Sequence, residues 1–431
     1  MLAMLALITL FGLYFFLKGL NVTQLNSIRQ SNAAAAMNLA RQALLAEALT
    51  PAMISNAGFL PLPDRGTNLV SGSWVASEGI ASQNFLGNIK DRSLIGKFPW
   101  DTLNTHVLRD ATGDCLWYAV SGRFKVSPKS DTMNWDTLGQ LDVINASGTV
   151  VATNLVALVI APGNVLQDQD RNLSNAAYRE CAGNYDARQY LDPYLSAQAI
   201  NGQTNYCSGG NVAPDTGNKT FVLADNDSYN DRMVFINVDE IFNPLIRRGD
   251  FPVAVGELLD YFKTENDSIK LANEAITNRN LLRNYANQVN AAFGLPPEPL
   301  EDLLPRTIIA GAKGTDNLIC PTEDSTLSTQ LPTFCKNWKE MLFLTELPTP
   351  MPISINGAQT AEICGRVLIF GGRKTATQIR VSAADRANKQ NYLESPNDTS
   401  FDVPVASNTN FAGMENFAAS RASVDLMRCL L

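Results

Sequence analysis

Few residues of this sequence have the type and spacing that catalysis requires. There is a single histidine, His106, and it lies among polar residues near Asp110 and Asp114. A lone histidine in such surroundings is more often a surface or capping residue than a general base, and it excludes a His-rich metal site. No GxSxG motif is present, and the GAKGT run at 311–315 lacks the spacing of a phosphate-binding loop. The sequence therefore favours a protein that is not an enzyme.

Two short acidic runs, DQDRN and DNDSYND, have the alternating oxygen ligands that calcium-binding loops use. Their candidate ligands are Asp168, Asp170 and Asn172 in the first run, and Asp225, Asp227 and Asp231 in the second. Neither run has the glycine and the distal glutamate of a complete EF-hand. A solvated turn is the favoured interpretation of both. No cofactor is predicted, and the first run is kept as a candidate calcium site.

The seven cysteines predict a disulfide framework rather than a redox or zinc motif, because no pair has CxxC spacing. Proximity in the sequence favours three pairs: Cys181 with Cys207, Cys320 with Cys335, and Cys364 with Cys429. Cys115 would then be an unpaired thiol within the strand-like DCLWYAV segment. Spacing does not determine connectivity, and reduced buried cysteines are the alternative. Disulfides would place the chain in an oxidising compartment.

The composition is that of a folded protein with a sizeable core. The chain has 431 residues, of which 45% are hydrophobic and 18% are charged. Its net charge is -8, so no strongly basic surface is required and nucleic acid is not predicted as a partner.

The first segment is the strongest signal in the sequence. Residues 1–17 read MLAMLALITLFGLYFFL, without a charge, and Lys18 follows. As a helix this run would be about 26 Å long, near the lower limit for spanning a bilayer. No basic region precedes it, as it would in a signal peptide. We expect that a leader has been removed and that Met1 is the processed terminus.

The helical pattern continues well beyond Lys18. No proline occurs from Asn21 to Leu49, and Pro51 is a natural stop. Apolar residues recur at helical spacing at Val22, Leu25, Ile28, Ala33, Met37, Ala40, Leu44 and Ala48. We expect one helix of about 75 Å over residues 1–52, apolar all round in its first third and amphipathic afterwards. The apolar part requires lipid or the same segment of neighbouring subunits to cover it.

Residues 53–431 are expected to form a large antiparallel β-rich globular head, which makes the fold class α+β. Strand-like runs occur at 116–126, 140–145, 150–161, 232–238 and 378–382, joined by short polar turns. Apolar residues at helical spacing, followed by Gly294 and prolines, predict a helical insertion at about 252–295.

An apolar mature terminus, a long helix and a β-rich head resemble type IV pilins and the pseudopilins of type II secretion. The segments RDATGDCLWYAVSGRF, VVATNLVALVIAPG and NDRMVFINVDEIF resemble large pilus-associated proteins of Gram-negative bacteria. The resemblance implies processing and methylation by a prepilin peptidase. It also implies residence in the inner membrane before assembly, and then packing of the helices into a filament core. Most pilins have glutamate at the fifth mature position, whereas this chain has Leu5.

The predicted function is therefore a structural subunit of a type IV pilus-like extracellular filament at the cell surface. Its partners would be copies of itself, in a homopolymer through the N-terminal helices, and the pilus assembly machinery. The expected assembly residues are Met1, Leu2, Leu5, Leu7, Ile8, Leu10, Phe11, Leu13, Phe15 and Phe16, with Gly12 and Gly19 as bend points.

Two alternatives remain at this stage. The K-type minor pseudopilin at a filament tip also lacks the glutamate, so a minor or tip subunit, or a tip adhesin, is the first. A membrane-anchored periplasmic enzyme or receptor is the second. The sequence does not indicate whether a filament would serve adhesion, motility, secretion, DNA uptake or electron transfer.

Overall fold

The structure is a computed structural model that describes residues 2–70, 73–83, 89–167, 169–172, 178–181, 183–192, 218–226, 228–264, 320–321, 330–402 and 410–430. The chain forms two compact units. Unit 1 comprises Met1–Ala52, Asn56–Met133 and Thr137–Leu245, and unit 2 comprises Met53–Ser55, Asn134–Asp136 and Ile246–Leu431.

Helix α1 (Leu2–Leu49) is the first element of unit 1, and its side chains are described at Met4, 7–15 and 24–49. Its later part is amphipathic, since Ala33, Met37, Ala40, Leu44 and Ala48 are all buried. These residues share one helical face, which contacts β7, β9 and α2 of the same unit. The predicted apolar stripe is thus confirmed from Ala33 onward, whereas Leu25 and Ile28 are exposed.

Local contacts end α1 near the predicted stop. The hydroxyl of Thr50 donates to the Ala46 carbonyl at 2.6 Å, and Pro51 follows. The chain then returns, and the Gly58 N–H donates to the Ala48 carbonyl at 2.6 Å. Gly58 has a φ of 92°, a conformation that glycine adopts without strain.

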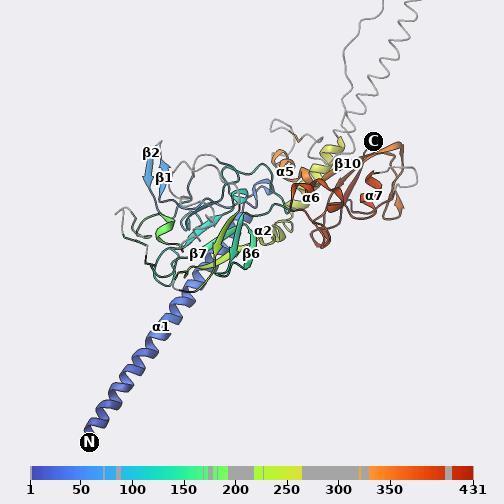
Figure 1. Cartoon of the computed structure of the whole chain (residues 1–431). Helices are drawn as coiled ribbons and strands as arrows, with labels where there is room; N and C mark the ends of the chain where they lie inside the picture. Colours follow the sequence, from blue (N-terminus) through green and yellow to red (C-terminus); the bar gives the residue numbers. More distant parts are fainter. Residues whose placement is uncertain are drawn as a thin grey trace, which may run out of the picture. The chain divides into compact units, whose positions relative to one another are not determined.

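Among the described residues, unit 1 also contains three small sheets (Figure 1). A hairpin pairs β1 (Thr67–Val70) with β2 (Ser73–Ala76). The antiparallel sheet β3-β4-β7-β9 is built from Leu94–Lys97, Trp117–Val120, Ala157–Ala161 and Arg232–Ile236. The sheet β6-β5-β8 is built from Val150–Leu155, Leu141–Ile144 and Lys219–Val222, and β5 runs parallel to β8. Helix α2 (Val238–Leu245) closes the unit.

The core of unit 1 follows from the sequences of these strands. Every residue of β7, ALVIA, is buried, as expected for a strand covered on both faces. One cluster joins the larger sheet to β5, β6 and β8 and includes Trp117, whose ring centroid lies 5.3 Å from that of Tyr190.

Unit 2 has its own sheets and its own aromatic core. The antiparallel sheet β10-β13-β15 is built from Leu342–Met351, Cys364–Phe370 and Leu426–Leu430. A smaller sheet orders β12 (Ala358–Gln359), β11 (Ser354–Ile355) and β14 (Asn410–Phe411), with β11 parallel to β14. Residues 250–264 are helical, as are α5 (Leu331–Trp338), α6 (Ala383–Ala387) and α7 (Asn397–Asp402). The rings of Trp135, Phe251, Phe334, Trp338, Phe370 and Phe417 pack together in the core.

Short 3₁₀ turns complete the described elements, at Ile54–Asn56, Gly122–Phe124, Ala187–Gln189, Lys339–Met341, Lys389–Asn391 and Ala419–Arg421.

The predicted fold class is wrong. Several small sheets divided between two units replace the single antiparallel head, and two of the strand pairings are parallel. Parallel pairing joins strands distant in the sequence, so turn signals between neighbouring runs did not indicate it. The expected membrane-spanning first third is not found either: no helix among the described residues is long and apolar enough to cross a membrane.

Two further expectations concern local elements. The predicted strand at 378–382 is not a strand. Its Arg380 side chain is instead buried and donates to Asp136, Gly372 and Gln378. Of the helical insertion expected at about 252–295, residues up to 264 are helical and the remainder lie outside the described residues.

Candidate functional site on helix α1

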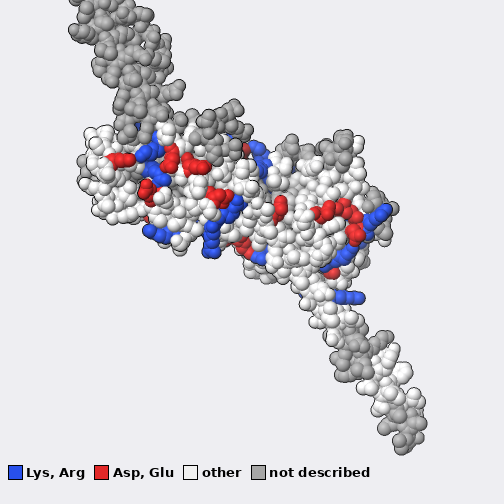
Figure 2. All heavy atoms as spheres, turned by 180° about the vertical axis from the view of Figure 1, so that it is seen from behind, with Lys and Arg blue, Asp and Glu red and all other residues white. Residues whose placement is uncertain are grey.

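The most unusual surface of unit 1 is the apolar start of α1. Its described side chains are more than half exposed at Met4, Leu7, Ile8, Leu10, Phe11, Leu13, Tyr14 and Phe15. In Figure 1 this part of α1 extends beyond the strands of unit 1, and in Figure 2 its described atoms are mostly white. A contiguous exposed apolar surface of this kind marks an interaction site in a folded protein.

The structure places the predicted assembly residues on this surface as far as it describes them. Leu7, Ile8, Leu10, Phe11, Leu13 and Phe15 are exposed, and Gly12 has open space around it. Met1 lies outside the described residues, and nothing is described of the side chains of Leu2, Leu5 and Phe16 or of the surroundings of Gly19.

Polar contacts hold the later part of α1 against unit 1. The Arg41 Nε donates to the Phe235 carbonyl of β9 at 3.1 Å, and the same guanidinium forms an ion pair with Glu240 of α2. Together with the buried face, these contacts orient α1 relative to the sheet.

An open cavity of about 850 Å³ lies where α1 meets the loops of unit 1. Asn26, Arg29 and Gln30 of α1 line one side, and loops around Arg109, Gly163 and Arg232 line the others. Its lining includes Asp110 and Asp225 but neither histidine nor cysteine, so it suits polar binding better than nucleophilic chemistry.

Three disulfides are present among the described residues, and they confirm the pairs Cys320–Cys335 and Cys364–Cys429. The third prediction was wrong, because Cys181 pairs with Cys115 rather than with Cys207. Cys207 lies outside the described residues, and Cys115 is not the unpaired core thiol that we expected.

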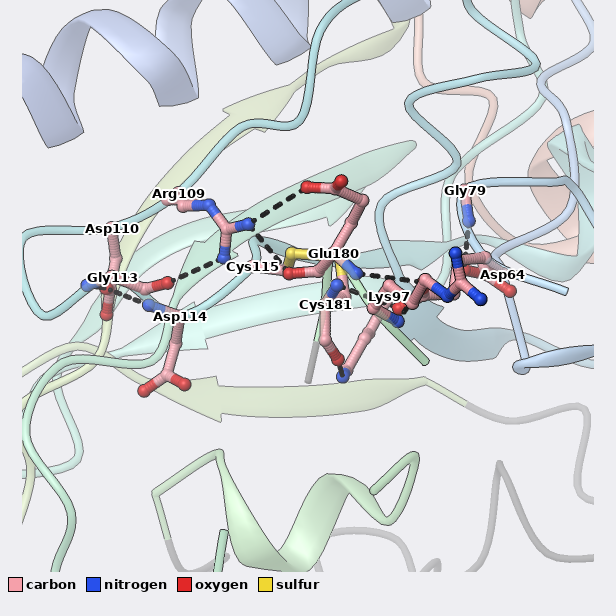
Figure 3. Close-up of a disulfide and its surroundings, with 12 residues drawn as sticks. Asp64, Gly79, Lys97, Arg109, Asp110, Gly113, Asp114, Cys115, Glu180 and Cys181 are labelled. Carbon is pink, nitrogen blue, oxygen red and sulfur yellow. Dashed lines mark hydrogen bonds and ion pairs between the residues drawn. A yellow bond between two sulfur atoms is a disulfide. The ribbon is translucent and has the colours of Figure 1, made fainter. Parts of the chain in front are cut away.

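Contacts distant in the sequence bring Cys181 to Cys115 (Figure 3). The Glu78 carboxylate accepts the backbone N–H groups of Arg179, Glu180 and Cys181 at 2.6, 3.0 and 2.8 Å. The Lys97 Nζ donates to the Cys181 carbonyl at 2.7 Å. Four donated hydrogen bonds therefore fix this loop beside β3 and β4, and sequence spacing carries no signal for them.

Buried charges support the same region. Asp64 accepts hydrogen bonds from the N–H groups of Gly66 and Gly79, both at 2.7 Å, and from the Tyr185 hydroxyl at 3.0 Å. Burial raises the pKa of Asp64 to about 6 and lowers the pKa of Lys97 to about 8. Asp64 and Lys97 also exchange backbone hydrogen bonds at 2.9 Å. These contacts give the pair a structural role in joining the loop to β3.

The first candidate calcium run has local partners for its described ligands. Asp168 lies outside the described residues, and the Asp170 carboxylate accepts the backbone N–H of Asn172 at 3.0 Å. His106 is exposed. In the part of the chain that the structure describes, no three His, Cys, Asp or Glu side chains are grouped as a metal site.

Comparisons with known proteins find no match for this chain among family models, curated proteins or solved structures.

Proposed function

We propose that this chain is a structural subunit of a type IV pilus-like extracellular filament, and that it assembles by packing α1 against the same helix of neighbouring copies. The observation that carries the proposal is the exposed apolar surface from Met4 to Phe15, at the start of a helix that unit 1 holds from Ala33 onward. Full burial of one Leu or Phe stabilises an assembly by roughly 1.5 to 3 kcal/mol.

The charge pattern and the disulfides also support the proposal. Residues 1–17 carry no charged side chain, so parallel copies of the apolar segment would bury no charged side chain between them. Disulfides persist in oxidising surroundings, which suits a location outside the cytoplasm. The acidic remainder of the chain would form the outer surface of the filament and keep it soluble.

A charge placed within the apolar surface tests the proposal. In the Leu7→Asp variant, each packed helix would carry a carboxylate into an apolar interface, which costs several kcal/mol. We expect fibres from the wild-type chain after detergent removal and none from the variant, as seen by negative-stain electron microscopy.

Val150→Asp is the matched control, because Val150 is 60% exposed and Leu7 is 64% exposed, but Val150 lies on β6. The control should form fibres as the wild type does. Circular dichroism should show that all three proteins are folded. Normal fibres from Leu7→Asp, or no fibres from the wild type, would contradict the proposal.

A further inference from the structure

The second acidic run, DNDSYND, is divided by the fold. Asp225 is 90% exposed and lies 3.9 Å from Arg232. Asp231 is 3% exposed and belongs to a buried cluster with Asp192, which is 7% exposed. The partner of Asp231 comes from a different loop, so the sequence pattern did not indicate it.

Each of the two buried carboxylates accepts a hydrogen bond from the backbone N–H of the other aspartate. The Asp192 N–H donates to Asp231 Oδ2 at 2.9 Å, and the Asp231 N–H donates to Asp192 Oδ2 at 2.8 Å. The Asn230 N–H also donates to Asp192 Oδ2, at 2.9 Å. This reciprocal arrangement uses the Oδ2 atom of each aspartate and keeps the two carboxylates adjacent.

In the described part of the chain, the Oδ1 atom of each aspartate has no hydrogen-bond partner. Among the described residues, Asp192 Oδ1, Asp231 Oδ1 and Asn230 Oδ1 are buried and accept no hydrogen bond. The Asn230 amide is oriented by its Nδ2, which donates to the Asn164 carbonyl at 2.8 Å. A buried polar atom without a partner usually indicates an ion or a water that completes the site.

The surrounding charges are also unbalanced. The nearby buried Asp110 differs from Asp192 and Asp231 because both of its carboxylate oxygens have partners. They accept four backbone N–H groups, those of Thr112, Gly113, Asp114 and Gly163. The buried guanidinium of Arg171 lies close by but is paired with Asp114 at 2.6 Å. Asp192 and Asp231 therefore share their surroundings with more negative than positive charge, and two adjacent buried carboxylates do not both ionise without a counter-ion.

We infer that Asp192, Asn230 and Asp231 form a binding site for a calcium ion. Two carboxylate oxygens and one amide oxygen are hard ligands, which Ca²⁺ prefers, and water or backbone oxygens would supply the remaining ligands. Mg²⁺ fits less well, because it retains several waters in a strict octahedron. Asn230 also lines the open cavity beside α1, so one residue of the proposed site borders a space that solvent reaches.

The inference is tested on the full-length protein in detergent, by calorimetric titration with CaCl₂ and by thermal unfolding with CaCl₂ or EDTA. We expect one bound Ca²⁺ per chain and a higher melting temperature in about 1 mM Ca²⁺, a concentration that suits extracellular calcium modules. Asp231→Asn should lose the calcium response and should melt at a higher temperature than the wild type in EDTA, because a neutral amide needs neither a counter-ion nor a proton at this position.

Asp225→Asn is the matched control, since it removes an exposed carboxylate from the same run and should respond to calcium as the wild type does. If Asp231→Asn does not fold, Tb³⁺ luminescence of the wild type, sensitised by the neighbouring Tyr190 and displaced by Ca²⁺, serves instead. Absence of calcium binding by the wild type, or retention of it by Asp231→Asn, would overturn the inference. Stabilisation of Asp231→Asn without calcium binding by the wild type would also overturn it, and would show a shared proton instead.

Discussion

At the scale of single residues, unit 2 places two carboxyl groups side by side. The Asp425 carboxylate is fully buried and accepts the Gly372 N–H at 3.0 Å and the Asn397 Nδ2 at 2.8 Å. The Glu394 N–H also donates to it, at 3.3 Å. Burial and the adjacent Asp425 carboxylate raise the pKa of Glu394 to about 8. Glu394 therefore retains its proton to a higher pH in the folded protein than it would in the unfolded chain.

This raised pKa predicts a specific pH dependence of stability. In the unfolded chain Glu394 titrates near 4.5, so between pH 4.5 and about 8 the folded state binds the additional proton. The contribution to stability is complete below pH 4.5 and is lost as the pH rises to about 8. We expect the wild-type urea midpoint to fall across this range, and Glu394→Gln to reduce that fall. The exposed Glu415→Gln is the control, and an equal fall in Glu394→Gln would contradict the assignment.

At the scale of elements, the Cys115–Cys181 disulfide joins the residue two positions before β4 to the loop that contains Cys181. The two cysteines are 66 residues apart in sequence. A cross-link that closes a loop of this length stabilises the fold by about 4 kcal/mol on the chain-entropy model. The hydrogen bonds of Glu78 and Lys97 with Cys181 also hold this loop beside β3 and β4.

We therefore expect non-reducing peptide mapping to yield a Cys115–Cys181 peptide. The double variant Cys115→Ala/Cys181→Ala should lose about 4 kcal/mol of unfolding free energy in denaturant titration. Cys207→Ala should retain both the cross-link and the wild-type stability. Recovery of a Cys181–Cys207 peptide from the native protein would show that the pairing is wrong.

At the scale of the whole molecule, α1 combines a buried face that belongs to unit 1 with an apolar start that unit 1 does not cover. Deletion of residues 1–23 would leave the face from Ala33 to Ala48 and the Arg41–Glu240 ion pair in place. We expect the shortened chain to be monomeric without detergent and the full chain to associate, as measured by light scattering after gel filtration. Association of the shortened chain would place the interface elsewhere.

Local patterns in the sequence predicted the features that depend on neighbouring residues. The helical spacing from Ala33 to Ala48 indicated a buried face. The short polar turn between the strand-like runs at 140–145 and 150–161 lies in the hairpin of β5 and β6, where Gly148 has a φ of 81°. These features follow from periodicity and turn chemistry, which act over a few residues.

Only the tertiary structure decided the features that join distant segments. The Cys115–Cys181 pair, the parallel pairing of β5 with β8 and the contact of Asp192 with Asp231 link residues between 39 and about 80 positions apart. Such contacts depend on where whole strands and loops pack, and on which buried charges find partners there. The apolar start and the buried face of α1 follow from the sequence, whereas the elements that cover this face, β7, β9 and α2, were determined by the packing of unit 1.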